Sequence, residues 1–439
     1  MAIVEQEEDV VADPGDDRGF GTPLTRRNAV TTALALAAGG TLAARSARPS
    51  SAAPRSQATP LAGAPGADAA AIIALAREAM AKQDLKAVIV RVTIDGQEVV
   101  TAAMGESMTG VPATTDMHFR NGAVAISYIS TLLLRLVDQN LVTLDDPLAT
   151  WLPDLPDAGQ VTLRMLANMT AGYPDFEKNT EFVQAFYADP FRQWTAQERI
   201  AIGLSTPRVF APGTNWDYSH TNYVILGQAL EKIGGQPLDL LLQEQVLGPL
   251  GLRNTVAWST PQISEPVLHA FSSERRQVLG IPAGTRFYEE STYWNPSWSL
   301  APGSIETTDI ADMATTAVAV GEGTLLSPES HQAQIDPALL GFGAPLAGCP
   351  TCRTLNEKLN YGLGVVLSGS WILQNPLFAG YGGVEAYLPA KKLAIAVATT
   401  FGEGSFDDEG NYKYSSHVEL FAAIGAYLAP DDPPPSPRA

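Results

Sequence analysis

A long apolar stretch at residues 127–137 carries leucine and valine at the spacing of one helix face. The residues that share this face are Leu132, Leu133, Leu136 and Val137. Spacing of this kind predicts a buried helix. The preceding residues 119–126 read F-R-N-G-A-V-A-I, with a glycine that breaks regular structure, and they predict a loop that leads into the helix.

Patterns on either side of this helix predict both helices and strands. An alanine-rich helix is expected from 69 to 82, followed by a strand at 86–94, a turn at Asp95-Gly96 and a return strand at 98–103. Near the other end, residues 393–400 predict a strand, and 417–428 have the spacing of a closing helix.

Three further stretches contain motif-like runs in front of predicted elements. Residues 161–173 read V-T-L-R-M-L-A-N-M-T-A-G-Y, a short helix stopped by Gly172. Residues 212–223 read P-G-T-N-W-D-Y-S-H-T-N-Y and lead into a helix at 224–233. Residues 378–387 read F-A-G-Y-G-G-V-E-A-Y and come before the strand at 393–400.

Taken in order, these runs resemble the serine β-lactamase and D-Ala-D-Ala peptidase superfamily, which includes penicillin-binding proteins, and in particular its class C and esterase-like branch. In that family the motif F-R-x-G-S-x-x-K leads into the buried helix, and residues 119–126 resemble it. Residues 212–223 resemble the family motif P-G-x-x-F-x-Y-S-N-x-N-Y. The resemblance covers about residues 69–428. It implies an α+β, β-lactamase/transpeptidase-like fold: an antiparallel sheet from the two chain ends, flanked by helices, plus a helical lobe from the middle.

The two residues that carry the chemistry of this family are replaced. The resemblance assigns an acylated Ser and, one turn later, a Lys that helps to take its proton, because positions i and i+3 share a helix face. Here these positions are Ala123 and Ile126, which offer neither a nucleophile nor a proton acceptor. No lysine of the chain has a serine three residues before it.

The other family positions are partly kept. Tyr218 stands where the resemblance places a proton-exchanging Tyr, and His220 replaces the substrate-orienting Asn. The [KH]-[TSD]-G slot on the strand edge reads Tyr381-Gly382-Gly383, and the glycines would let a ligand approach the backbone. Tyr218, His220 and Tyr381 are expected to line one cleft, although each is also consistent with ordinary packing or hydrogen bonding.

Other hydroxyl residues are poor replacements for the missing serine. Ser127 shares the helix face of Ala123, but it is expected to point into the core. Ser219, Ser304 and Thr170 lie near the family motifs without a paired base.

The two cysteines form Cys349-Pro-Thr-Cys352 in a loop rich in glycine and proline. A local disulfide is the first interpretation for an exported chain, and idle thiols are the alternative. A metal would need ligands from elsewhere in the chain, and five histidines and two cysteines form no obvious metal site. The sequence therefore predicts neither a metal nor a cofactor.

Composition and charge narrow the function classes. The chain has 439 residues with 45% hydrophobic content, enough for a sizeable core, and a formal net charge of −19. A negative surface repels nucleic acid and anionic membrane, so neither is an expected partner; the acidity can also serve solubility alone.

The N-terminal part resembles a Tat-type export leader. Arg26 and Arg27 precede an alanine-rich apolar stretch at 29–43, which is too short for a confident membrane span. We expect a leader at 1–53, a linker at 54–68, the folded domain at 69–428 and a disordered tail at 429–439. Such a leader predicts an exported protein of the cell envelope or the extracellular space. The alternative interpretation of residues 1–53 is a disordered basic-apolar segment.

Three functions fit these features. The first is an exported pseudoenzyme that binds a small molecule or a cell-wall peptide, and it rests on Ala123 and Ile126. The second is a divergent hydrolase of β-lactams, esters or D-amino-acid peptides, with a site rebuilt around Tyr218, His220 and Tyr381. The third is a non-catalytic structural or interaction protein. The sequence predicts no oligomeric state.

Overall fold

The computed structural model describes residues 67–257 and 260–435. The predicted leader at 1–53 and all but the last two residues of the predicted linker lie outside the described residues. In the part that is described, no helix combines the length and the apolar character that a membrane crossing requires.

The described helices are α1 (Ala67–Gln83), α2 (Val124–Asp138), α3 (Leu163–Ala167), α4 (Thr180–Ala188), α5 (Ala196–Gly203), α6 (His220–Gly234), α7 (Leu238–Leu242), α8 (Ile310–Glu322), α9 (Pro328–Gln334) and α10 (Ser416–Leu428), with short helical turns η1 (Leu148–Thr150), η2 (Phe176–Lys178), η3 (Gln243–Leu247), η4 (Pro296–Trp298), η5 (Pro389–Lys391) and η6 (Glu403–Ser405).

The described strands are β1 (Leu85–Ile94), β2 (Gln97–Met108), β3 (Val111–Pro112), β4 (Phe119–Arg120), β5 (Val256–Ala257), β6 (Phe271–Ser272), β7 (Glu289–Glu290), β8 (Glu306–Thr308), β9 (Asn360–Tyr361), β10 (Val366–Ser368), β11 (Trp371–Gln374), β12 (Leu377–Phe378), β13 (Tyr381–Leu388) and β14 (Leu393–Phe401).

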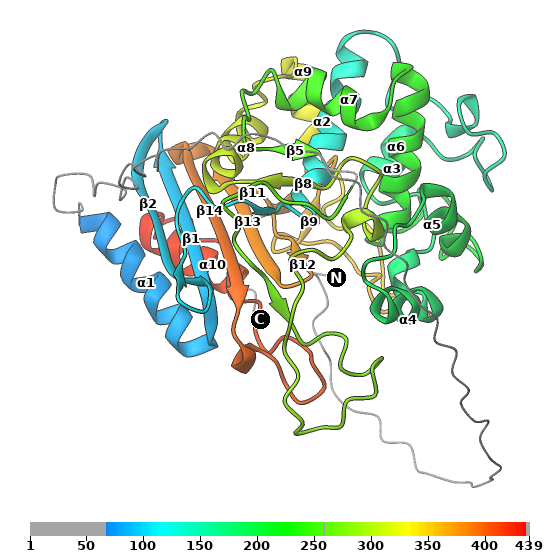
Figure 1. Ribbon diagram of the computed structural model, residues 1–439. Helices are drawn as coiled ribbons and strands as arrows, with labels where there is room; N and C mark the ends of the chain where they lie inside the picture. The colour runs from blue at the N-terminus through cyan, green and yellow to red at the C-terminus, as the bar shows by residue number, and fades with distance from the viewer. Residues whose placement is uncertain (1–66, 258–259, 436–439) are drawn as a thin grey trace, which may run out of the picture. The chain divides into compact units, whose positions relative to one another are not determined.

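The main sheet joins strands from the two ends of the domain. Its order is β3-β2-β1-β14-β13-β11-β10-β9, with β12 paired to β13, and its strand pairs are antiparallel. β1 lies between its hairpin partner β2 and β14, so the first and last strands of the domain are direct neighbours (Figure 1). The predicted antiparallel sheet built from both chain ends is confirmed.

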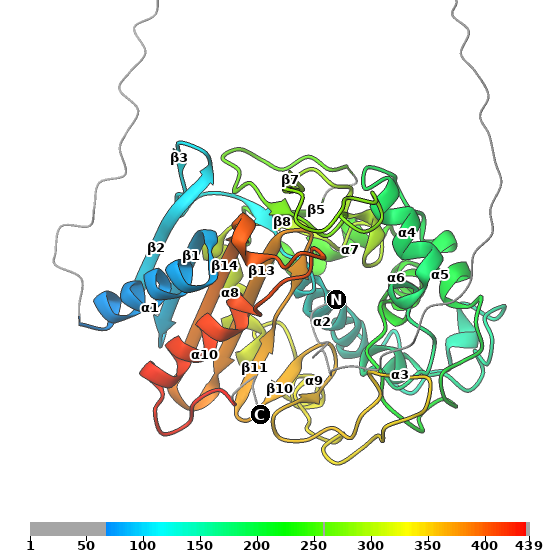
Figure 2. The ribbon, with the colours of Figure 1, turned by 90° about the horizontal axis from the view of Figure 1, so that it is seen from below.

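Helices cover both faces of this sheet. α1 and α10 lie together across one face (Figure 2), and α8 packs against β1, β13 and β14 from the other. All residues of β13 and β14 are buried for this reason, and β14 therefore reads as a nearly continuous apolar run without alternation.

The predicted buried helix is α2, and it begins at Val124, three residues earlier than the apolar pattern indicated. Nearly all of its side chains are buried, because it packs against α6, α7 and α9 of the helical lobe. A helix that is apolar around most of its circumference needs such an enclosed position. α2 is thus the rigid element on which the first wall of the site is built.

The end of the domain differs from the predicted disordered tail at 429–439. The indole Nε1 of Trp371 donates a hydrogen bond to the carbonyl oxygen of Asp432 at 3.1 Å. A Cβ at Gly425 of α10 would lie 2.4 Å from Cγ of Pro434, so this proline packs directly on the helix. Residues 429–435 therefore belong to the folded domain, because α10 and β11 offer apolar surface to them; residues 436–439 lie outside the described chain.

Candidate functional site

The loop before α2 brings Ala123 to the edge of a cleft. Gly122 has a φ of +51°, a conformation that glycine adopts easily, and a Cβ at this position would lie only 2.6 Å from Cβ of Pro376. The glycine therefore allows the start of α2 to approach a chain segment from the sheet. Ala123 is the N-cap residue of α2 and makes no side-chain capping bond.

The position one turn further along α2 belongs to the core. Ile126 is fully buried, with an exposed fraction of 0%. Ser127 is also fully buried, and its hydroxyl donates to the carbonyl oxygen of Val124 at 2.7 Å and to Glu385 Oε1 at 3.3 Å. Neither side chain is available to a molecule in the cleft.

The start of α6 forms the opposite wall. His220 is the first residue of the helix, and Tyr218 lies in the loop just before it. The two rings meet edge to face with centroids 5.1 Å apart, and the ring of Tyr361 lies 6.3 Å from that of Tyr218. This aromatic packing holds Tyr218 and His220 side by side on one wall.

The cleft between the two helix starts is narrow, with a free volume of about 30 Å³. Ordered water fits in such a space, whereas pockets for small molecules usually measure about 300–1,000 Å³. The rings of Trp298 and Phe378 stack with centroids 5.0 Å apart and narrow it. The lining residues are Ala123, Tyr218, His220, Trp298, Ser299, Val366, Gln374, Asn375, Pro376, Leu377 and Phe378.

Two buried carboxylates stand behind His220. Its Nδ1 lies 3.2 Å from Asp175 Oδ2 and 3.3 Å from Glu177 Oε2. The backbone N–H of His220 also donates to Asp175 Oδ1 at 3.1 Å. All three side chains are less than 10% exposed. Because Nδ1 is engaged by the carboxylates, Nε2 is the ring nitrogen left for a molecule in the cleft.

The pKa values of these two carboxyl groups move in opposite directions. Burial by itself would raise the pKa of Asp175, but the charge and hydrogen bond of His220, with Lys178 nearby, hold that pKa below its usual value. Burial raises the pKa of Glu177, although His220 opposes the shift. Asp175 is therefore the carboxylate that remains ionised and orients the imidazole.

The surroundings of the Tyr218 phenol disfavour its ionised form. Burial raises the pKa of its phenol well above the usual value, and the neighbouring Tyr361, Glu177 and Asp175 raise it further. A tyrosine that abstracts a proton at neutral pH needs a lowered pKa, which usually comes from a nearby cation. The ammonium group of Lys178 lies near this segment, but it donates to the Tyr218 carbonyl oxygen and to Asp217.

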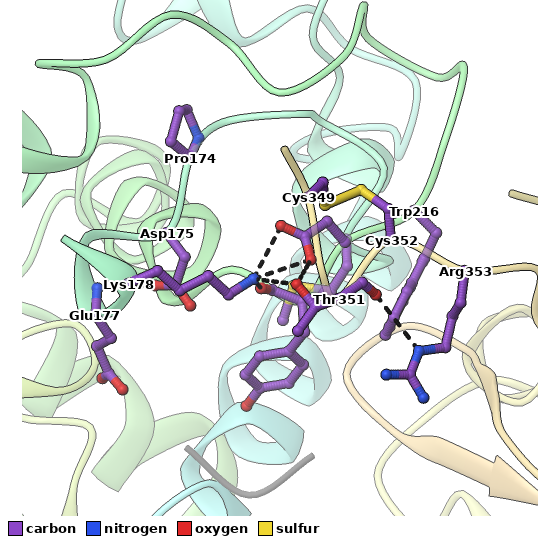
Figure 3. A network of polar contacts seen from close by, with 12 residues as sticks. Pro174, Asp175, Glu177, Lys178, Trp216, Cys349, Thr351, Cys352 and Arg353 are labelled. Carbon is purple, nitrogen blue, oxygen red and sulfur yellow. Dashed lines mark hydrogen bonds and ion pairs between the residues drawn. A yellow bond between two sulfur atoms is a disulfide. The ribbon is translucent and has the colours of Figure 1, made fainter. Parts of the chain in front are cut away.

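A polar network anchors the wall of α6 from behind (Figure 3). Nζ of Lys178 lies 2.9 and 3.0 Å from the two carboxylate oxygens of Asp217 and donates to Thr351 Oγ1 at 2.7 Å. Thr351 Oγ1 in turn donates to Asp217 Oδ1. Thr351 stands between Cys349 and Cys352, which form a disulfide. The network thus ties the loop between α9 and β9 to the segment that carries Tyr218.

Tyr381 is not part of the cleft, and this expectation from the sequence is wrong. Its side chain is buried, and its hydroxyl donates to the carbonyl oxygen of Leu268 at 2.7 Å. Burial raises the pKa of this phenol. The physical reason is its place in the sheet: Tyr381 begins β13 and pairs with Phe378 of β12 and Thr400 of β14, one strand away from the cleft.

The expected role of Gly382 and Gly383 is likewise wrong, because both lie inside the sheet. A Cβ on Gly382 would lie 2.6 Å from Nδ1 of the buried His417, and a Cβ on Gly383 would lie 3.2 Å from Cγ of Pro376. The missing side chains make room for protein atoms and not for a ligand.

The sheet side of the cleft is formed by residues 374–378, which the sequence analysis did not identify. Gln374 ends β11 and donates from Nε2 to the carbonyl oxygen of Gly364 at 2.7 Å. Asn375 and Pro376 follow and lead into β12. The residues of the sheet that border the cleft are therefore Gln374 to Phe378 and not Tyr381 to Gly383. A proline after a short apolar strand was the only local signal.

Asp175 and Glu177 were also missed. They come two and four residues after the run at 161–173 and reach His220 only through the tertiary structure, across 45 residues of sequence in the case of Asp175. An acidic residue after a proline is common in loops, so the sequence alone offered no signal for a buried pair.

No residue of the cleft suggests a cofactor. Among the described residues, one group of side chains has donor atoms close enough together for a metal ion: Asp217, Cys349 and Cys352, whose donor atoms lie within 4.8 Å of one another. The two sulfurs are bonded to each other in this structure and so are not free to bind one.

An antiparallel sheet with α1 and α10 on one face and α8 on the other, next to a helical lobe with a cleft at the start of α2, defines the serine β-lactamase and transpeptidase class of fold. The Beta-lactamase family model matches residues 72–418. The chain belongs to this family. Ala123 stands at the position of the family's nucleophilic serine, so membership in the family does not by itself establish acyl transfer.

Individual relatives match only part of the chain. It is 29% identical over 178 residues to D-alanyl-D-alanine-carboxypeptidase/endopeptidase AmpH of Escherichia coli, which covers 39% of this chain and 45% of the relative. It is 29% identical over 199 residues to esterase EstB of Burkholderia gladioli, covering 42% and 50%. The matches thus span half or less of these curated relatives.

A solved structure supports the fold over most of the chain. The D-amino acid amidase from Ochrobactrum anthropi SV3, complexed with D-phenylalanine, superimposes with a TM-score of 0.69 at 22% identity. The match covers 83% of this chain and all of the amidase. At this identity the likeness is one of fold.

Proposed function

We propose that this protein is an exported member of the β-lactamase family that binds a small ligand in its cleft without forming an acyl-enzyme. The observation that carries the proposal is the first wall of the cleft: Ala123 stands at the start of α2, opposite Tyr218 and His220, and Ile126 is fully buried behind it. A covalent acyl intermediate needs an activated nucleophile, and neither side chain supplies one.

The cleft still contains groups that suit binding. Tyr218, His220 and Ser299 place a phenol, an imidazole nitrogen and a hydroxyl next to the stacked rings of Trp298 and Phe378. Polar donors on an apolar wall are typical of small-molecule sites. The free volume of about 30 Å³ is water-sized. Side chains of the cleft must therefore move apart to admit a ligand such as the terminal residue of an acyl-D-Ala-D-Ala cell-wall peptide, which the names of the relatives suggest.

Export is the second part of the proposal and rests on Arg26 and Arg27 ahead of the apolar stretch at 29–43. The test is secretion of the full chain in a host with an active Tat system, compared with a variant in which both residues are changed to lysine. Export should be lost in the variant only. Equal export of both proteins would contradict a twin-arginine signal.

The binding proposal is tested by intact-protein mass spectrometry and calorimetry. The unchanged protein should show no covalent adduct with a penicillin or a reactive ester, and it should give a heat of binding with an acyl-D-Ala-D-Ala peptide. An Ala123→Ser variant is the matched control for a restored hydroxyl. A stable adduct on the unchanged protein would overturn the loss of acyl chemistry, and absence of any small-ligand binding would favour a purely structural or interaction role.

A second function is hydrolysis by an activated water molecule. It is favoured by the orientation of His220, whose Nδ1 faces the ionised Asp175 while the ring borders the cleft. An imidazole held in this way can act as a general base through Nε2, and Tyr218 could donate to a developing oxyanion. Turnover of an ester that is lost in both Asp175→Asn and Tyr218→Phe would support it. Turnover unchanged by either substitution would exclude this site as its source.

A further inference from the structure

The disulfide between Cys349 and Cys352 lies against a buried carboxylate from a distant part of the chain. The two sulfurs and an oxygen of Asp217 are all within 4.8 Å of one another. Asp217 comes from the loop before α6, while the cysteines belong to the loop between α9 and β9. Cys349 is 6%, Cys352 4% and Asp217 4% exposed.

We propose that the dithiol form of this protein binds one zinc ion through Cys349 Sγ, Cys352 Sγ and a carboxylate oxygen of Asp217, with water as the fourth ligand. Thiolate and carboxylate are both common zinc ligands, and four-coordinate sites are the rule. Tetrahedral bonds of ~2.3 Å to sulfur and ~2.0 Å to oxygen place two sulfurs ~3.8 Å apart and each sulfur ~3.5 Å from the oxygen. The sulfurs, 2.07 Å apart in the disulfide, must therefore separate on reduction, while the Asp217 oxygen already lies within 4.8 Å of both.

The redox step that precedes binding is a thiol–disulfide exchange. A small dithiol breaks the bond between Cys349 and Cys352 and closes to its own disulfide, so that it supplies two electrons and two protons. Two S–H bonds form on the protein. Zinc then replaces these two thiol protons, which pass to solvent.

The charges around the site suit a divalent cation. Two thiolates and the Asp217 carboxylate together balance one zinc ion and the ammonium of Lys178. That ammonium contacts both oxygens of Asp217, and its side chain is 37% exposed, so it can release one oxygen without becoming buried and unpaired. The hydroxyl of Thr351 donates to Oδ1 of the same carboxylate. Outer-sphere donors of this kind orient a metal ligand and tune its affinity.

All three ligands are buried and come from two distant segments, so we assign the ion the role of holding these segments together. In the oxidised protein, the disulfide and the network of Lys178 and Thr351 hold the cysteine loop against the segment that carries Tyr218. Zinc in the reduced protein would keep the same two segments together. The inference does not depend on ligand binding in the cleft.

The experiment uses the full chain without a metal-binding tag. The protein is reduced with a dithiol, the dithiol is removed under argon, and zinc is titrated against a colorimetric chelator. We expect about one zinc per reduced chain, a higher melting temperature with zinc than without it, and no binding to the oxidised chain. Cobalt in place of zinc should give the sulfur-to-metal absorption band of two thiolates.

Two variants separate the ligand set from non-specific binding. The paired substitution Cys349→Ser and Cys352→Ser should abolish binding. Asp217→Asn should weaken it by about tenfold or more, the scale of effect seen when the shell around a metal site is disturbed. Since Asp217→Asn also breaks the ion pair with Lys178, its thermal melt is recorded without zinc, and Lys178→Met serves as a control that leaves all three ligands in place.

Two results would overturn the proposal. One is a reduced chain that takes up no more zinc than the serine variant. The other is a folded Asp217→Asn protein that binds zinc as tightly as the unchanged chain, which would leave the two cysteines as an ordinary thiol pair.

Discussion

The two walls of the cleft differ in what they bury. On the wall of α2, Ala123 and Ile126 are apolar, and Ile126 is fully enclosed by the core. On the wall of α6, His220 is backed by two buried carboxylates, and Asp217 pairs with Lys178 below it. Both walls begin at the start of a buried helix, yet Ala123 and Ile126 are apolar on one wall, and the other wall has a dense set of polar and charged groups.

This difference separates the scaffold from the chemistry. An apolar residue at a buried helix position strengthens packing and costs nothing in desolvation, so the wall of α2 is stable without any function. Charged groups behind His220 are expensive to bury and need one another to remain there. The proposed function centres on Tyr218 and His220 because these charged groups lie directly behind His220.

Ile126→Lys should give the largest effect, because it places an ammonium group at a position that is fully buried. Burying an ion without a partner costs several kcal/mol, so we expect the free energy of unfolding to fall by more than about 4 kcal/mol. Urea denaturation measures it, with Ile126→Met as the control of similar volume. A loss below about 1 kcal/mol would show that this part of α2 opens to the cleft.

His220→Ala should come next, since it leaves Asp175 and Glu177 facing each other without the imidazole. Removing one partner of a buried ion pair typically costs about 3–5 kcal/mol. Tyr218→Phe on the same wall is the control and should change stability by less than about 1 kcal/mol. Equal effects of the two substitutions in urea melts would mean that the carboxylates are not held by His220.

Glu385→Gln tests the buried acid beneath α2, where Ser127 donates to Glu385. Burial raises the pKa of Glu385 to about 8, so the unfolded chain loses this proton near pH 4.5 while the folded chain keeps it up to about pH 8. The free energy of unfolding therefore falls across this window, by on the order of 1 kcal/mol per pH unit for this group.

The glutamine keeps an oxygen for Ser127 but does not titrate. The stability of the Glu385→Gln variant relative to the unchanged protein should be similar at pH 4.5 and should rise steadily to pH 8, as followed by urea melts at several pH values. A difference that is the same at every pH would show that Glu385 ionises in the folded state as it does in the unfolded chain.

The variant with Cys349→Ser and Cys352→Ser should be less stable than the oxidised unchanged protein by about 2 kcal/mol, the amount that chain entropy predicts for so short a loop. Thermal melts measure this loss, and reduction of the unchanged protein without metal should reproduce it. If the serine variant and the oxidised unchanged protein have the same melting temperature, the network of Lys178, Asp217 and Thr351 holds the loop without a contribution from the disulfide.

Ala123→Ser should have the smallest effect on stability. The side chain is only partly buried and borders the cleft, so one added oxygen should change the free energy of unfolding by less than about 0.5 kcal/mol. Thermal melts at matched concentration check it. A large loss would mean that the cleft has closed over this position, and would count against a ligand there.

The sequence by itself determined the fold class and showed that the family's serine and lysine are replaced. The apolar pattern of α2, the hairpin of β1 and β2 and the closing α10 are local signals, because helix and strand periodicity follow from neighbouring residues. The replacement of the family's serine and lysine by Ala123 and Ile126 could be predicted for a similar reason, because both occupy fixed positions in a contiguous motif.

Only the tertiary structure decided which side chains meet. Asp175 and Glu177 reach His220, Asp217 reaches the cysteine loop, and residues 374–378 replace 381–383 at the cleft through contacts between segments far apart in the chain. Burial and pairing of charge depend on the whole fold, so no local pattern could reveal them.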